Sequence, residues 1–179
     1  MARIAFVLGE DFEDSEFRKP YDALRNAGHT VEVLGAMAGT SVTGKHGKEH
    51  VKIEASASEQ DPEGYDALVI PGGYSPDHLR TNWGVVAFVQ AMVRDGKLIA
   101  AVCHGPQLLI EVDAVRGKTV TSWPSVKTDL ENAGATWVDR EVVVDGQLIT
   151  SRRPNDLAAF TEAIKAKLGA ARPHAHAAP

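Results

Sequence analysis

Short apolar segments alternate along this chain with longer segments of helical periodicity, and this alternation limits the folds that the chain can adopt. Residues 65–70 and 97–102 are apolar on both faces of a strand, which is typical of strands covered on both sides. Residues 3–8 and 29–34 predict two further strands. Strands separated by helices in this way form a parallel sheet between two helical layers.

The remaining segments fit that arrangement. Helices are predicted after the acidic loop at residues 10–16 as far as Gly28, and at residues 76–80, 83–94, 106–110, 126–133 and 155–168. Pro20 is expected close enough to the start of the first helix for its missing N–H to matter little. Short strands are predicted at 119–122 and 136–138, with strand–turn–strand units in 39–55 and 142–150. The fold class is therefore α/β: a flavodoxin-like, doubly wound, three-layer sandwich with a mainly parallel sheet.

Length and composition indicate one domain. The chain has 179 residues, and we expect a single domain over 1–169 and a disordered tail over 170–179. A lone cysteine excludes an intramolecular disulfide and favours a reducing compartment. With 19 Lys and Arg against 24 Asp and Glu, the net charge of −5 argues against nucleic acid as a partner. The sequence shows neither a membrane-spanning segment nor a signal peptide, so a cytoplasmic protein is expected.

The sequence contains no motif for nucleotide or metal binding. The chain contains no G-x-G-x-x-G and no G-x-x-x-x-G-K-[ST], so dinucleotide and P-loop functions are not predicted. His46 and His50 lie in a glycine- and lysine-rich turn and are interpreted as surface residues, as are His174 and His176 in the tail. No cofactor and no metal are expected, because a metal site needs three or more converging ligands.

Cys103 lies at the junction of a buried strand and the following helix. This is the layout of a nucleophile elbow, in which a sharp turn lifts a reactive side chain above the sheet. Ala101 and Gly105 are small enough to permit that turn, and unpaired N–H groups at a helix start favour a thiolate. Gly72 and Gly73 end a neighbouring strand, where their backbone N–H groups can face the same cleft and stabilise an oxyanion.

The acidic loop at residues 10–16 leaves three interpretations open. It can be a solvated run that complements the dipole of the next helix. It can hold Mg²⁺, as in a phosphoacceptor receiver domain. One of its carboxylates can instead face chemistry at the ends of the strands. The loop alone does not choose among these.

Four segments together resemble a known family. They are EDFEDSEFRKP, VIPGGYSPDHLR, AVCHGPQLL and TSWPSVKTDLENAGATWVDREVVVDG, and they occur in the order found in the PfpI family of intracellular protease I and deglycase-like proteins. That family belongs to the class I glutamine amidotransferase-like superfamily. The resemblance extends over residues 3–168.

The resemblance implies a role for each matching residue. Cys103 corresponds to the nucleophile, His104 to the catalytic histidine and Glu16 to the acid that hydrogen-bonds the thiol. Glu13 corresponds to a second acid in the pocket, and Trp123 to an aromatic residue that lines it. Asp77 falls where many members have a glutamate, supplied by a neighbouring subunit, that orients the histidine. The implied protein is therefore a homodimer or a higher homo-oligomer.

The resemblance also implies chemistry on small reactive carbonyls. We expect a stress-protective, cysteine-dependent hydrolase of the deglycase or glyoxalase type, acting on 2-oxoaldehydes or on glycated thiols and amines. One alternative is an intracellular cysteine peptidase. Another is a non-catalytic redox sensor or chaperone-like stress protein in which oxidation of Cys103 is the signal.

Overall fold

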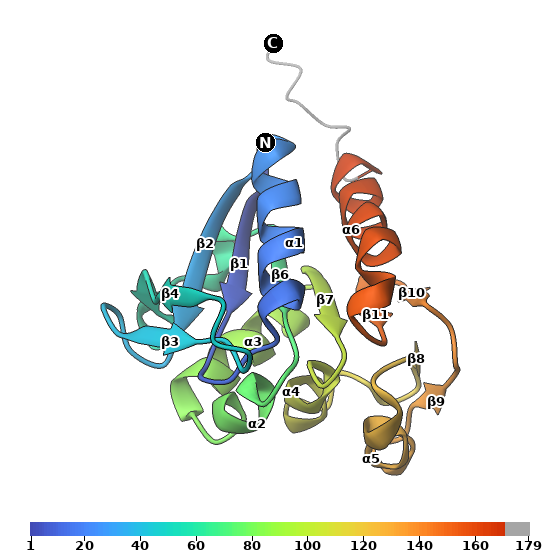
Figure 1. The fold of residues 1–179 in the computed structure, drawn as a ribbon. Helices are drawn as coiled ribbons and strands as arrows, with labels where there is room; N and C mark the ends of the chain where they lie inside the picture. The colour runs from blue at the N-terminus through green and yellow to red at the C-terminus, as the bar shows by residue number, and fades with distance from the viewer. Residues whose placement is uncertain (171–179) are drawn as a thin grey trace.

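The computed structural model describes residues 1–170, and Figure 1 shows a sheet with helices on both faces. The main sheet has the strand order β10-β11-β7-β6-β1-β2-β5, in which only the β10–β11 pair is antiparallel. The strands of this sheet are β1 (Arg3–Val7), β2 (Thr30–Gly35), β5 (Ala55–Ser56), β6 (Ala67–Ile70), β7 (Leu98–Val102), β10 (Val142–Asp145) and β11 (Leu148–Ser151). The predicted α/β sandwich with a mainly parallel sheet is confirmed.

Two small two-stranded sheets accompany the main one. The first is the hairpin of β3 (Ser41–Thr43) and β4 (His50–Lys52), and the second pairs β8 (Thr119–Val120) with β9 (Thr136–Trp137) in parallel. The helices are α1 (Asp14–Asn26), α2 (Ser75–Leu79), α3 (Trp83–Arg94), α4 (Pro106–Glu111), α5 (Lys127–Asn132) and α6 (Leu157–Ala170). No helix within residues 1–170 is long and apolar enough to cross a membrane.

The core consists of two apolar layers, one on each face of the sheet. Along β1, Ile4 and Phe6 point toward α1 and α6, whereas Ala5 and Val7 point toward α3 and α4, as the two-residue period of a strand requires. Figure 1 shows α1 and α6 side by side over one face, with α3 behind the sheet. Both faces of β6 and β7 are buried, which explains why these strands are apolar throughout.

Three details differ from the sequence-based expectation. Pro20 is the seventh residue of α1, in its interior, so no N–H is available to the carbonyl group four residues earlier, that of Glu16. Strand β5 was not predicted; it has two residues and pairs only with β2 among the described strands. Residue 170 belongs to α6, and the rest of the predicted disordered tail, with His174 and His176, lies outside the described residues.

An aromatic cluster anchors α1 to the sheet. The ring of Phe17 meets Phe6 and Phe12 edge-to-face, with ring centroids 5.8 Å and 5.5 Å apart, and Phe17 is 1% exposed. Edge-to-face pairs of this kind add stability beyond the area that they bury. Since Glu16 precedes Phe17, the same packing holds the backbone from which the Glu16 side chain extends.

The Phe17→Ala variant should therefore lose about 3–5 kcal/mol of unfolding free energy, because it leaves a cavity at the α1–sheet interface. Urea denaturation followed by circular dichroism measures this loss. Met37→Ala is the control, because Met37 is 64% exposed and its loss should cost no more than about 0.5 kcal/mol. Equal stability of the two variants would contradict the assignment of Phe17 to the core.

Candidate active site

Cys103 adopts the strained backbone of an elbow. Its φ is +63°, in the left-handed region that residues other than glycine seldom occupy. Its N–H donates to the carbonyl oxygen of Ser151 (3.0 Å), and its own carbonyl oxygen accepts from the N–H of Trp123 (3.0 Å). Gly105 completes the turn, because a Cβ there would lie 2.5 Å from the carbonyl oxygen of Ile70. The sequence-predicted strand–turn–helix geometry is present.

Three neighbouring strands end at this point. Strands β7, β6 and β1 are adjacent in the sheet, and ligand sites of open α/β sheets lie at the carboxyl ends of such strands. The loops that follow them bring together the elbow, the Gly72-Gly73 turn and the start of α1. They border a cavity of about 390 Å³, lined by Glu13, Glu16, Lys45, His46, Gly73, Tyr74, Cys103, His104, Trp123 and Pro154.

The carboxyl group of Glu16 lies beneath the thiol. Glu16 is 0% exposed, and its Oε2 accepts a hydrogen bond from the N–H of Gly72 (2.8 Å). Its Oε1 is buried and has no hydrogen-bond partner among the described residues, and the side chain of Cys103 lies beside the carboxyl group, near enough to influence its pKa. A Cβ at Gly72 would lie 2.6 Å from Oε2 and 2.7 Å from the Cβ of Cys103, so only glycine fits there. The N–H of Gly72 thus donates to Glu16, whereas the N–H of Gly73 faces the sulfur of Cys103.

Burial dominates the proton equilibria of this pair. It raises the pKa of Glu16 to about 8, against the smaller opposing effect of the Gly72 N–H. Burial also raises the pKa of the Cys103 thiol, and an ionised Glu16 raises it further, whereas the N–H groups of Gly73 and His104 lower it. The sequence suggested a favoured thiolate, but burial outweighs these N–H groups and the pKa of the thiol is raised.

The proximity of Glu16 and Cys103 allows the two groups to share a proton. Because Glu16 and Cys103 are buried together, the loss of a proton from one opposes its loss from the other. With a pKa near 8, Glu16 is largely protonated at neutral pH and can donate a hydrogen bond to the sulfur. A thiolate at Cys103 therefore depends on a proton held by Glu16.

One ring nitrogen of His104 faces the sulfur of Cys103, and the other faces a serine hydroxyl group. Its Nδ1 lies 3.3 Å from the Sγ of Cys103, and its Nε2 lies 3.3 Å from the Oγ of Ser125. Its ring stacks on Trp123 at a centroid distance of 6.3 Å. Burial lowers the pKa of His104, and the nearby charge of Lys45 lowers it further, so the imidazole is neutral at physiological pH.

Asp77 is the one predicted catalytic residue that the single chain does not bring to the cavity. It is exposed on α2 and is absent from the cavity lining, and Ser125 is the neighbour of His104 Nε2. It also does not cap α2, whose capping position is held by Tyr74. Its predicted role in a neighbouring subunit remains a prediction.

The acidic loop contains carboxylates in three different environments. Glu16 faces the thiol, as described above. The carboxylate of Glu13, which is 6% exposed, receives Lys45 Nζ (3.0 Å), His46 Nε2 (3.1 Å) and Ser15 Oγ (2.9 Å). Burial acts to raise the pKa of Glu13, but the hydrogen bonds from Lys45 and Ser15 outweigh it and the pKa is lowered. Asp14 accepts from backbone N–H groups of the β3–β4 loop. Two carboxylates thus face the cavity, while the third holds a loop.

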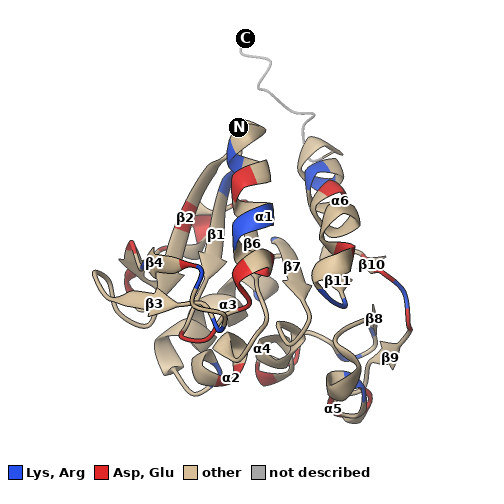
Figure 2. Cartoon of the chain, in the orientation of Figure 1, with Lys and Arg blue, Asp and Glu red and all other residues tan. Residues whose placement is uncertain are grey.

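Sequence reasoning missed the contribution of that loop. His46 is exposed (53%), as the sequence indicates, but both it and Lys45 also line the cavity and bind Glu13, which the sequence does not indicate. Ser125 and Tyr74 were missed as well. The only signal was a glycine-flanked run, Gly44-Lys45-His46-Gly47-Lys48, and nothing in it shows which carboxylate it meets. Figure 2 shows acidic and basic residues interspersed along α1 and the loops around its start.

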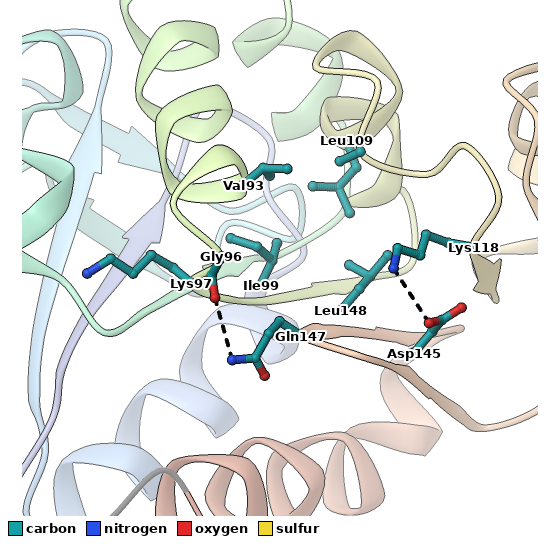
Figure 3. Close-up of a pocket in the computed structure, with 10 residues that line it drawn as sticks. Val93, Gly96, Lys97, Ile99, Leu109, Lys118, Asp145, Gln147 and Leu148 are labelled. Atoms are coloured by element: carbon teal, nitrogen blue, oxygen red, sulfur yellow. Dashed lines mark hydrogen bonds and ion pairs between the residues drawn. The ribbon is translucent and has the colours of Figure 1, made fainter. Parts of the chain in front are cut away.

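A second, smaller cavity lies at the opposite end of β7. Its volume is about 230 Å³, and its apolar floor includes Val93, Ile99 and Leu148 (Figure 3). The ion pair of Lys118 with Asp145 (3.7 Å) lies at its edge. Its lining contains no thiol and no imidazole, in contrast to that of the cavity at Cys103.

These features, an α/β sandwich with a strained elbow cysteine over a buried glutamate, are those of one class of protein. The model of the DJ-1/PfpI family matches residues 2–167, and the chain belongs to this family. It is 47% identical to protein/nucleic acid deglycase 2 of Escherichia coli over 94% of this chain and 98% of that one. It is 46% identical to a Bacillus subtilis protein named "Putative cysteine protease YraA" over 88% of this chain and 93% of that one.

Solved structures agree with this assignment. A two-domain protein of Anabaena variabilis with DJ-1/ThiJ/PfpI-like and ferritin-like domains has a TM-score of 0.93 at 44% identity, over 97% of this chain and 50% of that one. Drosophila melanogaster DJ-1beta has a TM-score of 0.84 at 32% identity, over 93% and 90% of the two chains. The resemblance noted from the sequence is confirmed.

The raised pKa of Glu16 has a consequence for stability. In the unfolded chain this carboxyl group ionises near pH 4.5, but in the folded protein only near pH 8. Between these values the folded state holds the extra proton, so stability falls as the pH rises, by at most about 1.4 kcal/mol per pH unit. The Glu16→Gln variant should lack this fall.

Urea denaturation at pH 5 and pH 8 tests this expectation. The free energy of unfolding of Glu16→Gln, relative to the unmodified protein, should be higher at pH 8 than at pH 5. Other titrating groups are common to both proteins and cancel in the difference. Glu63→Gln is the control, because Glu63 is exposed. A difference that does not change with pH would contradict the buried, protonated carboxyl group.

Proposed function

We propose that this protein is a cysteine-dependent, deglycase-like hydrolase that acts on small reactive carbonyls and their early glycation adducts. The observation that carries the proposal is the contact of the Cys103 thiol with the buried carboxyl group of Glu16 inside a small cavity. The similarity to protein/nucleic acid deglycase 2 of Escherichia coli supports a hydrolase-type, stress-protective function of this kind.

The reaction begins with addition. For a 2-oxoaldehyde, the Cys103 sulfur bonds to the aldehyde carbon, and the carbonyl oxygen takes a proton to give a hemithioacetal. The N–H of Gly73, which faces the sulfur, is the donor that we propose for the developing oxygen charge. The attacking form is the Cys103 thiolate beside a protonated Glu16, so the pair has already released one proton to solvent. Glu16 then gives its proton to the oxygen and is left ionised.

The later steps need a base that works near neutral pH. Glu16, ionised after the first step, removes the proton from the carbon that bears sulfur, and protonation of the neighbouring carbon converts the adduct to a 2-hydroxy thioester. Water then cleaves the carbon–sulfur bond, which restores the thiol and releases a 2-hydroxy acid. Neutral His104 can accept the proton of that water. The net change is the addition of one water to the 2-oxoaldehyde.

The dimensions of the site favour small substrates over peptides. The cavity of about 390 Å³ accommodates a short aldehyde or a single adduct, and its lining includes the exposed aromatic side chains of Tyr74 and Trp123. A peptidase needs a cleft that seats several residues of a chain. The cysteine-protease name of the Bacillus subtilis relative keeps peptide hydrolysis as the second candidate.

The test compares three substrates with reduced protein. Methylglyoxal, its preformed adduct with N-acetylcysteine and a casein peptide are incubated separately, and products are identified by NMR. We expect lactate from the first two and no peptide cleavage. Cys103→Ser, which keeps the size of the side chain, should reduce the rate at least 10³-fold because the thiolate is lost.

Measuring the free aldehyde in each reaction separates the two carbonyl activities. If the adduct disappears only as fast as it releases methylglyoxal, the protein acts on the free aldehyde. Cleavage of the peptide alone would support the peptidase. Loss of function by peroxide without any turnover would support the sensor.

We further propose that Asp77 acts on His104 of a second copy of this chain. Asp77 is exposed on α2, next to the Tyr74 segment that borders the cavity, so a partner can receive it. Mixing Cys103→Ser with Asp77→Ala chains should restore part of the activity, because one of the two sites in a mixed dimer then has both intact residues. The crossed site is excluded if mixed dimers form without activity, or if the active protein is a monomer.

A further inference from the structure

Among residues 1–170, Lys45 is the only lysine or arginine that lines the cavity of Cys103. Its ammonium group lies 3.0 Å from Oε2 of Glu13, and the Lys45 side chain is 34% exposed whereas that of Glu13 is 8% exposed. Glu13 is thus the buried member of the ion pair, and Lys45 is the partly exposed one. Most surface ion pairs of long side chains contribute little, because both partners remain in water. A pair anchored on a buried carboxylate has a defined position.

The loop that carries Lys45 is fixed by Asp14. The carboxylate of Asp14 accepts hydrogen bonds from the N–H groups of His46 (3.0 Å), Lys48 (2.9 Å) and Glu49 (2.9 Å). The N–H of Lys45 itself donates to the carbonyl oxygen of Phe12 (2.8 Å). Gly44 packs so closely on Asp14 that a Cβ would overlap its carboxylate. The segment that carries Glu13 and Glu16 therefore also sets the position of Lys45.

The charged and titratable groups around Lys45 are all part of the cavity. Glu13 and Glu16 face it from the start of α1, His46 from its own loop, Tyr74 from the loop before α2, and Cys103 and His104 from the elbow. The charge of Lys45 is attracted by Glu13, Cys103 and Glu16, and it opposes a positive charge on His104. The negative charge of Glu13 raises the pKa of Glu16, whereas the positive charge of Lys45 lowers it.

We propose that Lys45 is the counter-ion of the Cys103–Glu16 pair and that Asp14 is the residue that positions it. When the pair loses its first proton to solvent, the remaining proton stays between the sulfur and the Glu16 carboxyl group. The pair then carries one negative charge, which Lys45 stabilises without giving or taking a proton. This deepens the proposed function, which requires such a thiolate, but it concerns the reactivity of the thiol itself.

The experiment measures alkylation of Cys103 by iodoacetamide from pH 5 to pH 10, followed by mass spectrometry. Lys45→Met should move the midpoint of the rate profile up by about 1 pH unit, so that alkylation at neutral pH is about tenfold slower. Glu13→Gln should move the midpoint down, because it removes a negative charge near Glu16. If the ion pair only supported the structure, both variants would shift the midpoint in the same direction.

Two matched variants control for charge and for the loop. Lys45→Arg keeps the charge and should restore the midpoint to within about 0.3 pH unit. Lys48→Met removes a lysine that lies three residues away in the same loop but is not part of the cavity lining, and it should leave the profile unchanged. The effect of Lys45→Met should also shrink in high salt, because the side chain is partly exposed. Equal shifts in Lys45→Met and Lys48→Met would overturn the proposal.

The role of Asp14 is tested in combination. Asp14→Asn should raise the midpoint in the otherwise unmodified protein, because the loop is held less firmly, and should add nothing in the Lys45→Met variant. An equal shift in both backgrounds would show that Asp14 acts independently of Lys45. Alkylation requires no substrate, so it tests the counter-ion separately from the proposed function. Opposite shifts of the midpoint in Lys45→Met and Glu13→Gln, without turnover of methylglyoxal, would support the role of Lys45 and reject the proposed function. Turnover with unshifted profiles would reject the counter-ion alone.

Discussion

The contact between the Cys103 thiol and the buried carboxyl group of Glu16 is the interaction on which the rest of the site depends. A carboxylate that is taken out of water is costly, so the group keeps its proton to a pKa of about 8 and becomes a donor to the sulfur. Gly72 makes the contact possible, because its N–H binds Glu16 and its missing side chain leaves room for both partners. Glycine at this position is thus a requirement of the contact between the two side chains.

The site contains two unfavourable features that the fold must support. One is the left-handed backbone of Cys103, and the other is the buried carboxyl group. Strain of this kind persists only where the surroundings determine it fully. Here the adjacent strands β1, β6 and β7 have both faces buried, and hydrogen bonds to Ser151 and Trp123 hold the elbow from the far side. The apolar sheet is what allows a polar site to be held in this conformation.

The two ends of the sheet differ in character. At the carboxyl ends, α1, the β3–β4 loop and the elbow bring a thiol, two imidazoles and three carboxylates into one small region. At the other end of β7, the cavity is apolar with an ion pair at its edge. In a parallel sheet, loops that follow strands gather at one edge, so residues far apart in sequence meet there. This is why Glu13 and His104 share one electrostatic environment, to which the separate β3–β4 hairpin adds Lys45.

The sequence by itself determined the layers, nearly every helix and strand, and the elbow at Cys103, because apolar periodicity and the strand–cysteine–glycine–proline order are local. It also placed Glu16 with Cys103 through a family resemblance. Pro20 was expected at a helix start but lies inside α1, because Asp14 rather than a later residue begins that helix. The tertiary structure alone decided that Glu13, Asp14 and Glu16 have three different partners, that Lys45 and His46 reach the cavity, and that Ser125 meets His104. Charge and hydrogen-bond partners depend on which loops meet in space, and neighbouring carboxylates look alike in a sequence until burial distinguishes them.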